Sequence, residues 1–135
     1  MKEIIYPTPS RISEYNLLVL SLLPAKKKDS SKILSYTKLV NIIENCKDTQ
    51  GDLYDKAVFL LKGLVIGHAF ASGNRRTAFI AAKQFVVENG GKFNIKDEPF
   101  IAKVMVGVRE RYYTDEEIKE WIKNGTIREF DRFNR

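Results

Sequence analysis

The feature that most constrains this chain is a nearly continuous apolar stretch in its middle, residues 53–69. Its alanine, leucine, isoleucine, valine and phenylalanine residues cover most sides of the helix that their spacing predicts. A helix that is apolar on most sides must be covered by neighbours, so it belongs in the middle of a helical bundle. Gly63 and Gly67 lie inside it, four residues apart, and predict the close approach of one neighbouring helix.

Further helices are predicted before and after this central one. Apolar residues recur with helical spacing over residues 11–23 and 36–45, from the break at residues 72–74 to residue 89, from residue 98 to about 108, and over 115–124. Thr114 and Glu117 form a capping-box pattern at the start of the last helix. Residues 91–95 are expected to form a short extended piece. The alternation typical of strands is absent, so we predict a single all-α domain over residues 1–135, an irregular bundle of about six helices.

Composition excludes several classes of protein. The single cysteine, Cys46, rules out a disulfide scaffold within the chain and suits a reducing compartment, so we expect a cytoplasmic protein. One histidine and one cysteine cannot supply a four-ligand zinc site. No apolar run reaches the roughly eighteen residues that a membrane span needs, and the N-terminus has no apolar signal-peptide core.

The formal net charge of +6 permits a polyanionic partner without requiring one. Residues 25–32 contain three consecutive lysines, Lys26, Lys27 and Lys28, and are predicted to form a solvated loop. The alternative is a flap, in the form of a short β-hairpin, over a site. The charges are dispersed and no recognition helix with interleaved aromatic residues is present, so we expect no nucleic-acid partner.

One segment, residues 68–77, combines several side chains that can take part in catalysis or ligand binding. His68 is the only histidine, and it lies on the apolar stripe at the end of the central helix, so we expect it to point inward or into a cleft. A new helix then begins beside Gly73, Arg75 and Arg76. A helix N-terminus with glycine and arginines is typical of a phosphate-binding site, and a nearby histidine can act as a general base near pH 7. The combination predicts transfer of a phosphoryl or nucleotidyl group.

Each of these signals has a structural alternative. A lone histidine on an apolar helix face is more often a core residue whose hydrogen bonds are satisfied. Two arginines in the first turn of a helix are usually surface residues, and cations are disfavoured at that end. The unfavourable placement of Arg75 and Arg76 itself indicates that an anion compensates their charge. The dense combination therefore favours a functional site.

The segment from His68 to Ala78 resembles the signature of the Fic/Doc superfamily, His-x-Phe-x-(Asp/Glu)-Gly-Asn-x-Arg. It is most similar to the Doc (death-on-curing) branch, in which the pattern continues as Asn-Lys-Arg-Thr-Ala. The resemblance extends over residues 53–91 and continues more loosely to Trp121. The first fifty residues match only in being helical.

This resemblance implies an all-α protein that uses ATP and Mg²⁺ to modify a protein hydroxyl. Typical Fic proteins attach AMP, whereas Doc toxins phosphorylate a translation elongation factor and stop protein synthesis until an antitoxin protein blocks them. By analogy, His68 takes the proton of the target hydroxyl, Asn74 and the backbone near Gly73 orient the phosphates, Arg76 binds phosphate oxygens as a fork, and Phe70 anchors the segment in the core. The implied ATP-binding residues are Ser72, Gly73, Asn74, Arg75 and Arg76.

The segment departs from the family pattern at three positions. Arg75 stands where AMP-transferring members carry glycine, and Phe79 stands where they carry a second arginine, so phosphorylation is favoured over AMP transfer. Ser72 replaces the acidic residue that holds Mg²⁺, and a neutral hydroxyl is a weak ligand for this cation. A catalytically weakened module that binds a nucleotide or a partner is therefore an alternative, and AMP transfer is another.

The family's self-inhibitory motif, Ser/Thr-x-x-x-Glu-Gly/Asn, has no full copy in the chain. Residues 10–14 come close, but Tyr15 follows Glu14 where the motif requires glycine or asparagine. We therefore expect inhibition by a separate antitoxin chain.

Overall fold

The computed structural model describes residues 3–22 and 31–132, and within them the chain forms six helices and no strand. The only β-type pairing in this part of the chain is an isolated antiparallel bridge between Ile33 and Phe70. The prediction of an all-α bundle is thereby confirmed. The helices are α1 (Pro9–Ser21), α2 (Tyr36–Asp48), α3 (Leu53–Gly67), α4 (Asn74–Glu88), α5 (Phe100–Arg109) and α6 (Asp115–Asn124).

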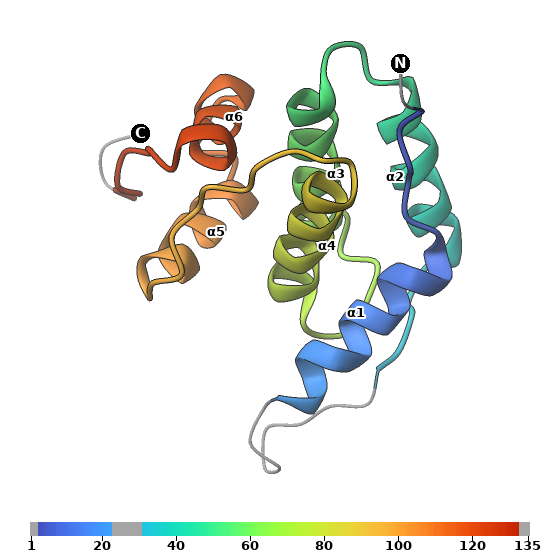
Figure 1. Cartoon of the computed structure of the whole chain (residues 1–135). Helices are drawn as coiled ribbons and strands as arrows, with labels where there is room; N and C mark the ends of the chain where they lie inside the picture. The colour runs from blue at the N-terminus through green and yellow to red at the C-terminus, as the bar shows by residue number, and fades with distance from the viewer. Residues whose placement is uncertain (1–2, 23–30, 133–135) are drawn as a thin grey trace.

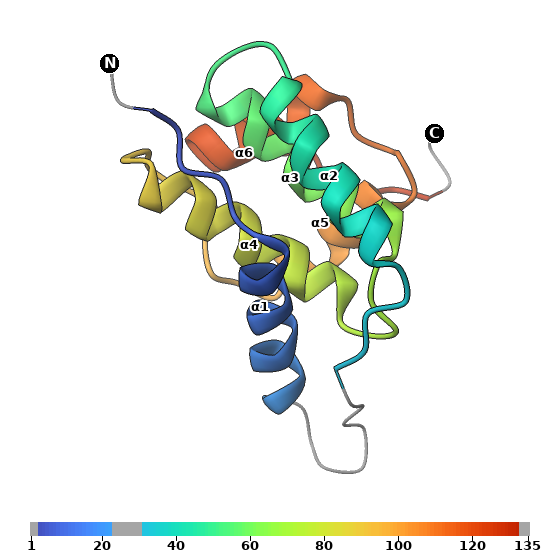
Figure 2. The same ribbon diagram turned by 90° about the vertical axis from the view of Figure 1, so that its right-hand side faces the viewer.

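Helix α3 lies in the middle of the bundle, as its apolar surface predicts (Figure 1). It packs against α2, α4, α5 and α6, while α1 packs across α4 and also touches α2 (Figure 2). A Cβ atom added at Gly63 would lie 2.9 Å from Ile42 Cγ2, and one at Gly67 would lie 3.1 Å from Ile42 Cδ1. The two glycines therefore admit α2 closely, which confirms the expectation drawn from their spacing.

Helix boundaries follow the capping residues. Thr8 Oγ1 accepts a hydrogen bond from Arg11 N at 3.1 Å, so α1 begins at Pro9, two residues before the predicted start. The predicted end of that helix, at residue 23, lies outside the described residues. Helix α2 extends to residue 48 rather than 45, and α5 begins at Phe100. Residues 91–95 form no strand, so the expected extended piece makes no β pairing.

The start of α3 is held by a capping box. Asp52 Oδ1 accepts from Tyr54 N and Asp55 N, while Asp55 Oδ2 accepts from Asp52 N at 2.8 Å. Lys119 of α6 lies 2.9 Å from Asp55 Oδ1, and its hydrogen bond lowers the pKa of the Asp55 carboxyl group. The predicted capping box of Thr114 and Glu117 at α6 is also present.

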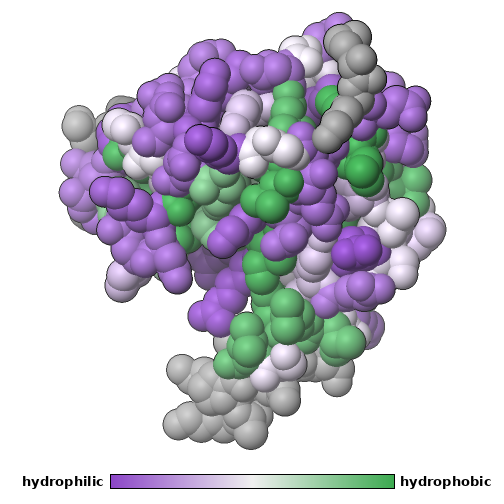
Figure 3. All heavy atoms as spheres, in the orientation of Figure 1, coloured by the Kyte–Doolittle hydropathy of each residue, from purple (hydrophilic) through white to green (hydrophobic). Residues whose placement is uncertain are grey.

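Most of the basic loop at residues 25–32, with its three lysines, lies outside the described residues, and so does most of the alternative hairpin flap. No helix of the described chain is long and apolar enough to cross a membrane. Figure 3 shows a mainly hydrophilic face with an apolar patch at the lower end of the molecule. Leu17 and Leu22 on the outer side of α1 are 60% and 70% exposed.

Lys56 is a buried charged residue on α3, with only 8% of its surface exposed. Its Nζ atom donates to the carbonyl oxygens of Lys47 at 2.9 Å and Thr49 at 2.8 Å, and more weakly to that of Cys46 at 3.4 Å. These carbonyls lie at the C-terminal end of α2, where helix carbonyls lose their intrahelical donors. The Cys46 carbonyl also accepts from Thr49 N at 3.2 Å. The ammonium group therefore caps α2 from its neighbour and ties the two helices together.

Lys56→Met is expected to lower the free energy of unfolding by about 1–3 kcal/mol, because it removes the ammonium donor from the carbonyls of Lys47 and Thr49 at this helix end. Urea unfolding at neutral pH measures this change. Lys62→Met is the matched control on the same helix, because Lys62 forms only an exposed ion pair with Asp115, and its cost should stay below about 1 kcal/mol. Equal stability of the two variants would contradict the capping role.

Candidate functional site

The predicted site lies in the connection between α3 and α4, a loop formed by residues 68–73. His68 follows the last residue of α3 and adopts a left-handed conformation, with φ 51° and ψ 53°. Its side chain is exposed. Of the two expected orientations of His68, the inward one is therefore wrong, because the helix ends at Gly67 and the left-handed turn carries the imidazole out to the surface.

The loop is anchored on one side by the segment that leads into α2. Leu34 N donates to Ala69 O at 2.7 Å, and Ala71 N donates to Lys32 O at 2.9 Å. Phe70 between them is 1% exposed, so its ring serves as the expected anchor in the core. These backbone bonds fix the path of the chain directly after His68.

Gly73 and Asn74 form the start of α4. Gly73 has φ 77°, a left-handed conformation that favours glycine. No side chain caps this helix, and its first turn contains no acidic residue. Its first backbone N–H groups consequently have no side-chain partner among residues 3–22 and 31–132, and the helix dipole is positive there. An anion such as a phosphate fits this end.

The Asn74 side chain ties the loop together. Asn74 Oδ1 accepts from Phe70 N at 3.1 Å, and Asn74 Nδ2 donates to Phe70 O at 2.8 Å. The same Nδ2 lies 3.2 Å from His68 Nδ1. Because Nδ2 can only donate, His68 Nδ1 is the acceptor, and a neutral ring carries its proton on Nε2. The Asn74 amide therefore bonds to the loop backbone and lies beside His68. The role in orienting phosphate groups that the resemblance implies for Asn74 stays a prediction.

Arg75 and Arg76 follow in the first turn of α4, and both side chains are exposed. Neither forms an ion pair with any residue in the described ranges 3–22 and 31–132. Lys38 of α2 adds a further cation beside the end of α3, where its Nζ atom donates to Gly67 O at 3.2 Å. The surface around His68 is therefore positively charged, as an anion-binding site requires.

The residues at this site do not form a protein-held metal site. The described part of the chain contains no group of three or more His, Cys, Asp or Glu side chains that could hold a metal ion. Ser72, at the family's acidic position, is half-buried and offers a neutral hydroxyl. The donor set fits phosphate oxygens through N–H groups and cations, but it does not fit Mg²⁺.

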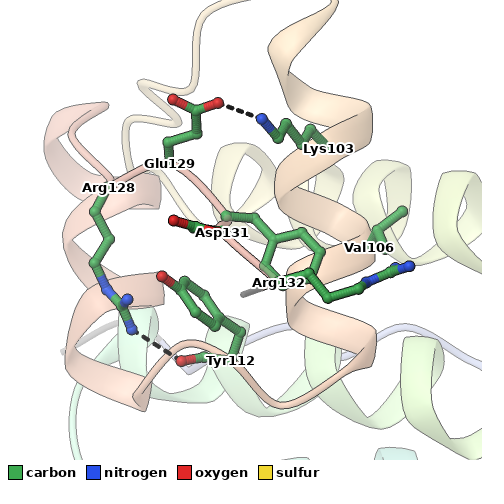
Figure 4. A pocket seen from close by; sticks show the side chains of 8 residues that line it. Lys103, Val106, Tyr112, Arg128, Glu129, Asp131 and Arg132 are labelled. Carbon is green, nitrogen blue, oxygen red and sulfur yellow. Dashed lines mark hydrogen bonds and ion pairs between the residues drawn. The ribbon is translucent and has the colours of Figure 1, made fainter. Parts of the chain in front are cut away.

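A separate groove of about 780 Å³ lies between α5 and the C-terminal segment (Figure 4). Its three cations are already paired: Lys103 with Glu129, Arg128 with Glu117, and Arg132 with Glu110. The hydrogen bond from Arg128 lowers the pKa of the Glu117 carboxyl group, which keeps that pair charged. None of the predicted site residues lines this groove, and its charges are compensated, so it is a poorer anion site than loop 68–73.

Sequence reasoning missed one polar residue behind the loop, Asn16 of α1, which is fully buried. Its Nδ2 atom donates to Ser72 O at 2.8 Å and to Thr77 Oγ1 at 3.1 Å. The available signal was an asparagine on the inner face of a helix, four residues after the buried Ile12. A polar side chain at such a position needs partners, and here the partners belong to the candidate site.

The site can now be compared with known proteins. The family model described as Fic/DOC family matches residues 5–86, which include α1 to α4 and all the predicted site residues. The search of curated proteins found no match. Because the model covers more than half of the chain, this protein belongs to the Fic/DOC family.

Proposed function

We propose that this protein transfers the γ-phosphoryl group of ATP to a hydroxyl group of another protein, as Doc-type members of its family do. The observation that carries the proposal is the geometry of loop 68–73. The loop presents an exposed histidine directly beside an uncapped, cationic helix N-terminus. The Asn74 amide connects the two parts, because it bonds to the loop backbone and lies 3.2 Å from His68 Nδ1.

In this proposal the start of α4 binds the phosphate groups of ATP. The free N–H groups of its first turn donate to phosphate oxygens, the Arg76 guanidinium binds them as a fork, and Arg75 adds a second positive charge. Gly73 allows the turn, and Ser72 precedes it. Mg²⁺ would enter together with ATP and would supply positive charge to the phosphates, and the proposal assigns it no ligand among the described residues.

The chemical step is an in-line displacement. The hydroxyl oxygen of the target attacks the γ-phosphorus, the bond to the β–γ bridging oxygen breaks, and ADP leaves. His68 accepts the hydroxyl proton at Nε2. Because the contact with Asn74 places the ring proton on Nε2, the step requires His68 to leave this contact and to take the Nδ1–H form. Asn74 acts in this scheme as a positioning residue.

Two residues support phosphoryl transfer over AMP transfer. Arg75 places a long cation where AMP-transferring members have glycine. Phe79, at the position of their second arginine, is partly buried and packs against the core, with its ring centroid 5.4 Å from that of Phe93 and 6.3 Å from that of Trp121. A side chain packed in this way leaves the phosphate site without the second clamp, which supports phosphoryl transfer. AMP transfer is the alternative.

The biological setting belongs to the same proposal. A Doc-like kinase acts in the cytoplasm on a translation elongation factor, blocks protein synthesis, and is controlled by a cognate antitoxin protein. The second candidate is a catalytically weakened module that binds a nucleotide or a partner. The observation that favours it is the neutral Ser72, together with the finding that the described residues contain no group of three or more His, Cys, Asp or Glu side chains that could hold a metal ion.

Incubation with γ-labelled ATP, Mg²⁺ and cell lysate is expected to label a protein band, and His68→Ala should reduce the labelling at least about 100-fold, because it removes the general base. His68 is exposed, so the variant should keep its fold. Arg11→Ala, a change at another exposed residue, is the control and should label normally. Transfer of α-label instead would establish AMP transfer, and bound ATP with no label would favour the weakened module.

Ser72→Asp is expected to raise the rate at limiting Mg²⁺ about tenfold, because a carboxylate is a far better ligand for this ion than a hydroxyl group. A Mg²⁺ titration of labelled-phosphate transfer measures the effect. Ser72→Asn has a similar shape without the charge and should give no gain. If the aspartate and asparagine variants respond alike, position 72 is not where the metal approaches the phosphates.

A further inference from the structure

Asn16 is the fully buried polar residue on the inner face of α1, where it lies among the buried Ile12, Val19 and Leu20. An amide at such a place is costly unless its hydrogen-bonding groups have partners. Both ends of the Asn16 amide are satisfied, and no buried side-chain nitrogen or oxygen of the described chain lacks a partner. The identity of the partners indicates what this residue does.

The three partners come from three different segments. Asn16 Nδ2 donates to Ser72 O at 2.8 Å and to Thr77 Oγ1 at 3.1 Å, and Asn16 Oδ1 accepts from Ser31 Oγ at 2.7 Å. Ser72 belongs to the loop before α4, Thr77 to the first turns of α4, and Ser31 to the segment before α2. One side chain therefore joins α1 to the loop before α4, to α4 itself and to the segment before α2.

The packing around Gly73 shows how Asn16 can orient the backbone at the start of α4. A Cβ atom added at Gly73 would lie 3.2 Å from Asn16 Nδ2 and 3.3 Å from side-chain atoms of Leu20 and Val19. Helix α1 thus closes the back of the turn. The Ser72 carbonyl and the Gly73 N–H belong to the same peptide unit, so the bond from Asn16 to Ser72 O also fixes the orientation of that N–H group.

We propose that Asn16 is a positioning residue for phosphate binding in this protein. It fixes the Ser72–Gly73 peptide, and through it the direction of the first N–H groups of α4, without touching the substrate. This inference rests on the proposed function for the identity of the ligand, ATP. Without the Asn16 side-chain amide, the Ser72 carbonyl has to turn toward water to find a donor. The first N–H groups of α4 then no longer point toward one phosphate position.

A matched control exists elsewhere in the chain. Asn89 uses its amide in the same manner at a site unrelated to the loop: its Oδ1 accepts from Ile5 N at 2.7 Å, and its Nδ2 donates to Ile5 O at 2.9 Å and to Phe85 O at 2.8 Å. Asn16→Ala and Asn89→Ala each remove three hydrogen bonds, of which all three of Asn16 and two of Asn89 join distant segments. A purely structural role for Asn16 predicts that the two variants behave alike at the phosphate site.

The first measurement is amide hydrogen exchange of the ligand-free proteins by NMR. In Asn16→Ala, the amides of Phe70 and Thr77, which donate to Asn74 Oδ1 and Gly73 O, should exchange about tenfold faster or more. In Asn89→Ala these two amides should be unchanged, and the Ile5 amide should lose protection instead. Unchanged exchange at Phe70 and Thr77 in Asn16→Ala would overturn the proposal.

The second measurement is the affinity for Mg²⁺-ATP at a temperature at which every variant is folded. Asn16→Ala should weaken binding about tenfold, with a smaller loss in the rate at saturating ATP, while Asn89→Ala binds as the wild type does. Ser31→Ala removes only the bond to Asn16 Oδ1, and it should shift affinity in the same direction by a smaller factor even if Asn16→Ala fails to fold. Wild-type affinity in both variants contradicts the inference. A wild-type protein that binds no ATP contradicts the proposed function, while the exchange measurement still decides the role of Asn16.

Discussion

The burial of α3 is the constraint on which the rest of this structure depends. A fifteen-residue helix with apolar side chains on most of its surface is stable in water only when other helices cover it. Four helices of the described chain do so, and Gly63 and Gly67 let one of them approach especially closely. Where α3 ends, the left-handed turn at His68 brings a reactive side chain out to the surface, while the following Ala69 and Phe70 stay buried.

Order in the exposed loop comes from two buried asparagines. Asn74 holds the loop from within, through both backbone groups of Phe70, and Asn16 holds it from behind, through the carbonyl of Ser72. These bonds engage both backbone groups of Phe70 and the carbonyl of Ser72, while no described side chain caps the first N–H groups of α4. The asparagine bonds thus hold the turn, and the N–H groups at the start of α4 stay available to bind an anion. The exposed Arg75 and Arg76 add positive charge beside these N–H groups.

The bundle and the candidate segment could be predicted from sequence because local patterns carry them. The apolar surface of residues 53–67, the capping residues and the dense group from His68 to Arg76 are all visible within short windows. The orientation of His68 could not be predicted, because left-handed helix ends usually carry glycine and the apolar stripe continues through this residue. The role of Asn16 was also hidden, since its partners lie 15, 56 and 61 residues away in the chain.

The central claim is that the start of α4 binds the phosphate groups of ATP beside His68. The most direct test is to titrate ¹⁵N-labelled protein with Mg²⁺-ATP and to map the amide chemical-shift changes by NMR. Our account predicts the largest changes at the backbone amides of residues 73–76, accompanied by a shift of the His68 ring signals. Changes confined to the groove between α5 and the C-terminal segment, with the amides of residues 73–76 unmoved, would contradict it.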